Sequence, residues 1–311
     1  MNSLVFPGQG SQYVGMGKDL FDSFPEVKVV FEEVNNALDQ NLSSLIFNGP
    51  DDELTLTENA QPAIMTVGIA IIEILNSRGF TVNRIANISA GHSLGEYSSL
   101  TALNSLSLAD TAKLLKLRGK AMQNSFLSGE GSMAAILGLN INDIDETINR
   151  SEIKNVCQIA NDNAPGQVVI SLAKENFDYI SEQLKSFGAK KTIPLNVSSG
   201  FHSSFMRKAE KEMIHKLENL DINDSEYTIV SNYNVQPVRK KNEIIDNLKK
   251  QITNRVRWVE TIKYFESKNV NTIIEIGPNK ILNGLNKRIS SNFTLINVSN
   301  INELENLKNV I

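Results

Sequence analysis

Residues 91–95 read Gly-His-Ser-Leu-Gly and fit the pattern G-x-S-x-G. The apolar run at residues 85–89 predicts a strand before this stretch, and residues 94–103 predict a helix after it. A strand–turn–helix setting is where this pattern forms a nucleophile elbow. The glycines two positions before and after Ser93 remove side chains that would clash in a tight turn, and the helix amides favour negative charge. We therefore predict that Ser93 is a nucleophile in an α/β domain.

A serine nucleophile needs a base, and the chain has three histidines. His92 neighbours Ser93 and would point away from its hydroxyl on a sharp turn. His215 belongs to a strongly charged helix predicted over residues 208–220, which favours a solvated side chain. By elimination, the base is His202, in the small-residue loop 198–204. No acid stands out as a third triad member; a backbone carbonyl can orient a histidine instead, and a thioester has a good leaving group.

Arg118 lies at an unusual position in the helix predicted over residues 108–122, which starts with a capping box at Ser107 and Asp110. The apolar stripe of this helix consists of Leu108, Ala112, Leu115 and Met122, and Arg118 lies on the same stripe. A charge facing the core must be paired with an internal acid or must await a ligand, and both alternatives stay open at this point.

The other segments predict a large α/β domain interrupted by a small one. Strands are predicted at residues 4–6, 228–231 and 272–276, with helices at 280–289 and at 59–78, the latter capped by Asn59 with Pro62 in its first turn. The Gly-rich stretch 128–132 indicates a boundary. Strands at 133–139, 157–161, 168–171 and 191–196 and helices at 142–150 and 174–187 follow it in β-α-β-β-α-β order. We predict an α/β-hydrolase-like domain with a parallel sheet (residues 1–126 and 198–311) and a ferredoxin-like insert (residues 127–197).

Composition narrows the possible functions. The 311 residues have a formal charge of −4, which gives no electrostatic case for nucleic acid or an anionic membrane. One cysteine precludes an intramolecular disulfide, and one cysteine with three histidines argues against a zinc cluster. The first residues lack a basic start, and no segment approaches the roughly 18 apolar residues of a membrane span. We expect a cytoplasmic monomer without a metal or bound cofactor.

Eleven blocks of the chain, taken in order, resemble malonyl-CoA:acyl carrier protein transacylases. They are residues 6–12 (Phe-Pro-Gly-Gln-Gly-Ser-Gln), 15–17, 57–63, 90–97, 117–123, 131–136, 161–170, 201–203, 230–232, 251–258 and 275–278. The resemblance spans almost the whole chain. It departs at Gly200 and Arg255, where proline is usual, and at Leu172, where glycine is common.

The resemblance implies a role for each matching position. Ser93 would be the nucleophile, and His202 the general base and acid. Gln9 and the backbone N–H of Leu94 would form the oxyanion hole. Arg118 would bind the malonyl carboxylate, because a guanidinium matches a carboxylate with two parallel hydrogen bonds. The main-chain carbonyl of Gln251 would orient the histidine.

Two further positions are expected to line the site. Asn161 matches a site-lining position loosely, and Phe201 is bulky enough to fill the space that the extra methyl of a methylmalonyl group would need. Four basic residues, Lys190, Lys191, Arg207 and Lys208, are candidates for a patch that meets an acidic carrier protein, although solvated surface charges are the better explanation of them.

The implied reaction is ping-pong transfer of a malonyl group from malonyl-CoA to the phosphopantetheine thiol of acyl carrier protein, a transient partner, supplying fatty acid synthesis. Three alternatives stay open. The first is a freestanding acyltransferase that loads polyketide synthase carriers. The second is a serine hydrolase that releases the acyl group to water. The third is a catalytically silent subunit that binds the carrier protein.

Overall fold

The computed structural model describes residues 1–125, 130–197 and 199–307. Its larger part is built on a six-stranded sheet with the order β10-β9-β1-β2-β7-β8. These strands are β1 (Asn2–Phe6), β2 (Ile88–Gly91), β7 (Thr228–Val230), β8 (Pro237–Val238), β9 (Thr272–Ile276) and β10 (Thr294–Val298). Neighbouring strands are parallel except β8, which is antiparallel to β7. The predicted α/β architecture with a parallel sheet is confirmed.

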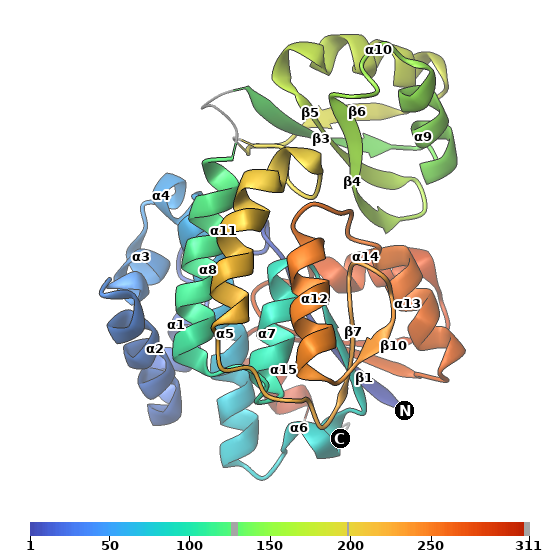
Figure 1. Cartoon of the computed structure of the whole chain (residues 1–311). Helices are drawn as coiled ribbons and strands as arrows, with labels where there is room; N and C mark the ends of the chain where they lie inside the picture. The colour runs from blue at the N-terminus through green and yellow to red at the C-terminus, as the bar shows by residue number, and fades with distance from the viewer. Residues whose placement is uncertain (126–129, 198, 308–311) are drawn as a thin grey trace.

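Helices cover both faces of this sheet (Figure 1). They are α1 (Lys18–Ser23), α2 (Pro25–Leu38), α3 (Leu42–Asn48), α4 (Asp51–Thr55), α5 (Thr57–Ser77), α6 (Val82–Ile85), α7 (Leu94–Ala102), α8 (Leu108–Gln123), α11 (Arg207–Glu218), α12 (Lys241–Gln251), α13 (Trp258–Ser267), α14 (Ile281–Ile289) and α15 (Ile301–Leu307), with the 3-10 turn η2 (Ser204–Met206) before α11.

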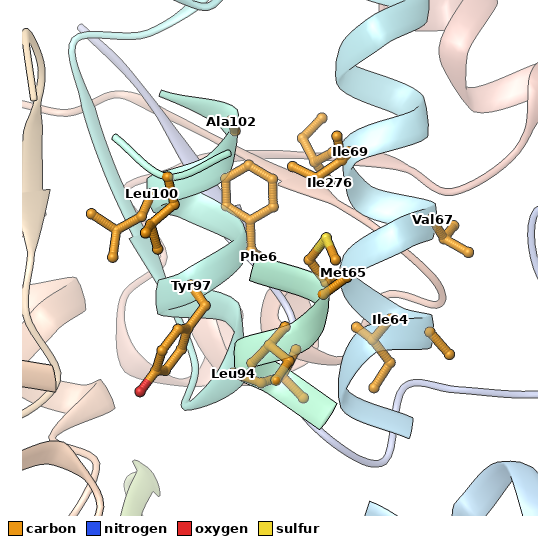
Figure 2. Close-up of a cluster of buried hydrophobic side chains, with 14 of the residues drawn as sticks. Phe6, Ile64, Met65, Val67, Ile69, Leu94, Tyr97, Leu100, Ala102 and Ile276 are labelled. Atoms are coloured by element: carbon orange, nitrogen blue, oxygen red, sulfur yellow. The ribbon is translucent and has the colours of Figure 1, made fainter. Parts of the chain in front are cut away.

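The alternation of side chains along β1 separates the two cores. Leu4 and Phe6 point into one cluster, and Val5 points into the other, with α13 and α14. Figure 2 shows Phe6 between α5 and α7, with Met65 and Leu100 among its neighbours. This packing holds α7, and therefore the turn that precedes it, at the end of the central strands.

A second sheet is antiparallel throughout and has the order β4-β5-β3-β6. Along the chain its elements are β3 (Gly131–Leu137), α9 (Ile141–Arg150), β4 (Cys157–Ala164), β5 (Gln167–Ala173), η1 (Lys174–Asn176), α10 (Phe177–Ser186) and β6 (Lys191–Pro194). This is the predicted ferredoxin-like order, and the unit lies beside the large sheet at the top of Figure 1. The exact domain boundaries stay a prediction, because they and part of the Gly-rich stretch fall on residues 126–129 and 198, outside the described residues.

Several predicted element boundaries differ from the structure, and two of these differences have a clear local cause. Helix α5 begins at Thr57 after an N-cap at Leu56, so Asn59 is not the cap and Pro62 lies beyond the first turn. The Asn59 side chain instead donates to Glu53 O and accepts from Lys116 Nζ. The predicted strand 85–89 begins only at Ile88, because residues 82–85 form a helical turn closed by hydrogen bonds to Thr81 O.

Helix α5 is also long and apolar enough to satisfy the length and composition of a membrane span, contrary to the expectation that no segment comes close. Of its most apolar 18-residue window, 83% is buried inside the protein. Its neighbours include α2, α7 and α8. The apolar character of α5 therefore matches its position inside the helical layer.

Candidate active site

Ser93 lies in the turn between β2 and α7, with φ 54° and ψ −108°. A Cβ atom on Gly91 would come within 1.9 Å of the Gly95 carbonyl, and one on Gly95 within 2.1 Å of Phe6 O. Both glycines are therefore required by close backbone packing, as the sequence predicts. A left-handed serine is a strained residue that neighbouring structure must hold in place.

Asn232 holds this turn from the loop after β7. Its side chain donates from Nδ2 to Gly91 O over 2.7 Å and accepts from the Ser93 N–H over 2.7 Å. Sequence reasoning assigned Asn232 no role. A polar residue directly after a buried strand was the available signal, because that position lies at the carboxyl end of a parallel sheet.

His202 is brought to Ser93 from a distant part of the chain. Its Nε2 lies 2.7 Å from Ser93 Oγ, and its Nδ1 lies 2.9 Å from the main-chain carbonyl of Gln251. Burial first, and the positive charge of Arg118 second, lower the pKa of His202 to about 3. The ring is therefore neutral near pH 7: Nδ1–H donates to Gln251 O, and Nε2 accepts from the serine hydroxyl.

The other two histidines lie elsewhere. His92 Nε2 is 2.9 Å from Asn163 Oδ1, on the insert strand β4. His215 is exposed on α11. Neither makes a hydrogen bond to Ser93 among the described residues.

Arg118 is fully buried, and its guanidinium faces Ser93. It donates from Nη2 to Ser93 Oγ over 3.0 Å and to Gln251 Oε1 over 2.9 Å, and from Nη1 to Gln61 Oε1 over 2.8 Å. Its Nε has no hydrogen-bond partner among the residues that the structure describes. Within the described ranges it forms no ion pair with an acidic side chain. Of the two alternatives left open by the sequence, pairing of Arg118 with an internal acid is therefore not found among the described residues.

A cavity of about 350 Å³ opens at Ser93. Its lining includes the predicted residues Gln9, Leu94, Asn161, Phe201 and His202. Arg118 and Gln251 are not among the lining residues; both are fully buried, and Arg118 reaches the cavity only through its hydrogen bond to Ser93 Oγ. Leu94 is the first residue of α7, and its N–H meets no acceptor within the part of the chain that the structure describes. Free amides at a helix start are suited to an anionic oxygen. The Gln9 side chain donates to Thr57 Oγ1 over 3.3 Å.

Comparison with known proteins shows the family of this chain. Residues 3–298 match the family described as acyl transferase domain. A malonyl CoA-acyl carrier protein transacylase of Bacillus subtilis is 41% identical over 304 residues, covering 97% of this chain and 95% of the relative. The chain belongs to the malonyl-CoA–acyl carrier protein transacylase family.

Two solved structures extend this family relationship. An acyl-carrier-protein-S-malonyltransferase from Bartonella henselae has a TM-score of 0.97 at 43% identity, covering 99% of this chain and 98% of its own. A malonyl-transacylase solved in complex with its type II PKS acyl-carrier protein has a TM-score of 0.95 at 34% identity, covering 99% of both chains.

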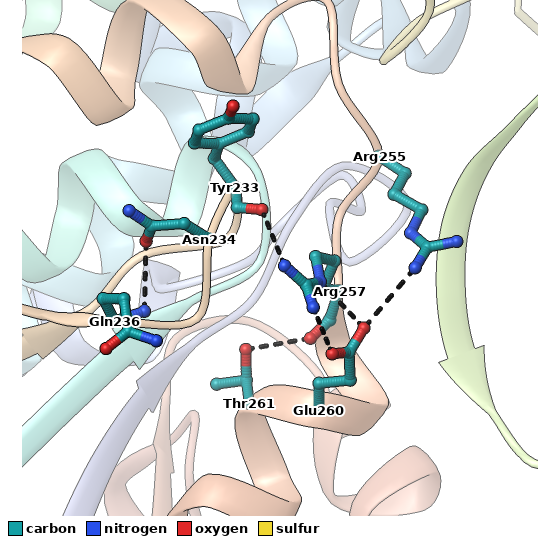
Figure 3. A network of polar contacts seen from close by, with 7 residues as sticks. All are labelled: Tyr233, Asn234, Gln236, Arg255, Arg257, Glu260 and Thr261. Atoms are coloured by element: carbon teal, nitrogen blue, oxygen red, sulfur yellow. Dashed lines mark hydrogen bonds and ion pairs between the residues drawn. The ribbon is translucent and has the colours of Figure 1, made fainter.

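The three departures from the family pattern lie outside the cavity. A Cβ on Gly200 would come within 2.8 Å of the Phe205 ring, which explains the glycine. Leu172 is buried in the core of the insert. Figure 3 shows Arg255 and Arg257 directed at Glu260, which Arg255 approaches to 3.6 Å.

Proposed function

We propose that the chain transfers a malonyl group from malonyl-CoA to the phosphopantetheine thiol of an acyl carrier protein through an ester on Ser93. The observation that supports this most directly is the buried guanidinium of Arg118, 3.0 Å from Ser93 Oγ and unpaired with any acid of the described chain. In malonyl-CoA, one methylene separates the free carboxylate from the thioester carbonyl. A cation beside the nucleophile therefore suits this acyl group.

In the first half-reaction, Ser93 Oγ attacks the thioester carbonyl while its proton moves to His202 Nε2. The carbonyl oxygen takes up negative charge in the hole assigned to Gln9 and the Leu94 N–H. When the C–S bond breaks, His202 returns the proton to the coenzyme A sulfur. The Gln251 carbonyl, which accepts from Nδ1 over 2.9 Å, holds the ring in the required tautomer without a carboxylate.

The second half-reaction runs in the reverse sense. The carrier thiol gives its proton to His202 and attacks the malonyl ester, and Ser93 regains its proton as the C–O bond breaks. Asn161 and Phe201 are proposed to line the acyl pocket, Phe201 by filling the space of a branched acyl group. Ping-pong kinetics follow from this scheme, with malonyl-CoA and the carrier protein bearing a free phosphopantetheine thiol as the two substrates.

A more specific proposal concerns which carrier protein accepts the malonyl group and which pathway it serves. We favour a fatty acid synthesis carrier that meets the exposed residues Lys190, Lys191, Arg207 and Lys208. The likeness to a transacylase bound to its type II PKS carrier supports the polyketide alternative. Relative kcat/KM for a fatty acid carrier and a polyketide carrier separates the two. A monomer in the cytoplasm, with no nucleic-acid or membrane partner, stays a prediction from composition.

The decisive experiment is intact-protein mass spectrometry after mixing with malonyl-CoA, followed by addition of carrier protein with its phosphopantetheine arm. The proposal expects a malonyl adduct on the wild type that moves to the carrier and is absent in Ser93→Ala. Decay of the adduct to free malonate with the carrier ignored would instead indicate a hydrolase. No adduct with any acyl-CoA would indicate a silent carrier-binding subunit.

A further inference from the structure

Glu96 is a buried carboxyl that the reaction scheme does not use. It lies in the first turn of α7, three residues after Ser93, and is 2% exposed. Its Oε2 accepts from Gln251 Nε2 over 2.7 Å and from the Asn232 N–H over 3.1 Å. Burial raises the pKa of Glu96 to about 7. A buried acid is costly to keep, so its contacts call for an explanation.

The side-chain amide of Gln251 connects Glu96 to Arg118. Its Nε2 donates to Glu96 Oε2 and, over 3.0 Å, to Ser93 O, while its Oε1 accepts from Arg118 Nη2 over 2.9 Å. An amide has one donor end and one acceptor end. Because Glu96 Oε2 and Ser93 O both accept from the NH₂ end of the Gln251 amide, the oxygen end of that amide must face the guanidinium of Arg118. The opposite orientation would place an NH₂ group against Arg118 and an oxygen against the carboxyl of Glu96.

We propose that Glu96 is a positioning residue that orients the Gln251 side chain and, through it, aims Arg118 at the acyl group bound beside Ser93. This inference rests on the proposed malonyl transfer and deepens it, because it assigns part of the preference for a carboxylated acyl group to a residue that touches no substrate. The proposed effect of Glu96 on Arg118 passes through the side-chain amide of Gln251. The contact that orients His202 uses the backbone of Gln251 and does not depend on the amide orientation.

The test compares the ratio of kcat/KM for malonyl-CoA to that for acetyl-CoA in Glu96→Ala, Glu96→Gln and Glu96→Asp. Glu96→Ala should lower this ratio about tenfold, the effect of one hydrogen bond to a charged group. Glu96→Gln should keep the ratio within about threefold, because one amide oxygen can accept both hydrogen bonds. Glu96→Asp keeps the charge but is one methylene too short for Gln251, so it should lower the ratio as well. It also provides the test if Glu96→Ala does not fold.

Glu275 offers a matched control. It is also a buried carboxyl, and burial raises its pKa to about 7. Its hydrogen bonds, however, come from the backbone N–H groups of Leu282 and Asn283 at the start of α14. Glu275→Ala should lower stability without changing the ratio. Labelling of Ser93 by a fluorophosphonate needs no acyl carboxylate, and its rate should stay within about threefold of wild type in Glu96→Ala.

Two results would overturn the inference. One is an unchanged malonyl-to-acetyl ratio in both Glu96→Ala and Glu96→Asp. The other is an equal drop in the ratio when Glu96→Ala is made in an Arg118→Ala background, because an effect exerted through Arg118 must vanish there. Failure of the proposed function is a separate result: the wild type itself would show no malonyl adduct.

Discussion

Arg118 donates from Nη2 to Ser93 Oγ over 3.0 Å, although the two residues are 25 positions apart in the sequence. Ser93 is the N-cap of α7, and Arg118 belongs to α8, which packs against α7. The contact places a permanent positive charge beside Ser93, the proposed nucleophile. Such a charge favours both a serine oxygen that loses its proton and an acyl group that ends in a carboxylate.

Removing this charge tests its part in acyl selection. Arg118→Ala should lower kcat/KM for malonyl-CoA about a hundredfold, because the charge-assisted hydrogen bonds to the carboxylate are lost. Transfer of uncharged acetyl groups should become relatively more favourable. Arg118→Lys should recover only part of the malonyl rate, since an ammonium cannot reproduce a planar fork. Normal malonyl transfer with negligible acetyl transfer in Arg118→Ala would contradict the assignment.

The strained backbone at Ser93 predicts that replacing this residue by glycine relieves strain and stabilises the protein while it removes the proposed activity. Ser93→Gly should be more stable than Ser93→Ala by about 1 kcal/mol, because only glycine adopts φ 54° without strain. Both variants should fail to form a malonyl adduct. Urea unfolding measures the difference, and equal stabilities would show that the turn stores no strain.

The low pKa of His202 predicts a flat pH profile on the acid side. With a pKa of about 3 in the folded protein, His202 stays neutral from pH 8 to pH 5, so the rate of Ser93 acylation should show no break near 6.5. Single-turnover labelling by malonyl-CoA across this range checks the expectation. A loss of rate with an apparent pKa near 6.5 that persists in Glu96→Gln, which removes the carboxyl whose pKa burial raises to about 7, would mean that the His202 ring is readily protonated in the folded protein.

The lowered pKa of His202 also makes the free energy of unfolding depend on pH. An unfolded chain binds a proton at His202 below about pH 6.5, whereas the folded protein binds it only near pH 3. The contribution of His202 to stability is therefore present above pH 6.5 and is lost as the pH falls toward 3. His202→Gln should lose less stability than the wild type between pH 7.5 and pH 5, as measured by urea unfolding.

Two glycines with different surroundings, Gly95 at the Ser93 turn and Gly284 in α14, predict opposite effects of alanine on stability. Gly95→Ala should destabilise the protein by more than about 3 kcal/mol and abolish transfer, because its Cβ would overlap Phe6 O at 2.1 Å. A Cβ atom on Gly284 in α14 would meet no described atom within 4 Å beyond the backbone of its own helix, so Gly284→Ala should stabilise by up to about 1 kcal/mol. Thermal unfolding of the two variants provides the comparison. A mild effect of Gly95→Ala would show that the turn can shift.

Local features of the chain were predictable where their cause was local. The G-x-S-x-G turn follows from steric limits on Gly91 and Gly95, and the Ser107 cap of α8 was correctly placed because Ser107 accepts from the nearby Asp110 N–H. The Asn59 cap was wrong because its side chain makes contacts with Glu53 and Lys116 instead. A polar residue near a helix start is ambiguous when distant partners compete for it.

The sequence by itself determined the reacting types of side chain and the alternation of strands and helices, because steric limits and hydrophobic periodicity act over a few residues. It also marked Arg118 as a charge on an apolar stripe. Only the tertiary structure decided that no internal acid of the described residues forms an ion pair with Arg118 and that Asn232 and Glu96 surround the turn. The Gln251 carbonyl, which the family resemblance implied as the partner of His202, lies 2.9 Å from its Nδ1. Those contacts join α7, α8, α12 and the loop after β7, and their geometry depends on how these elements pack at the end of the sheet.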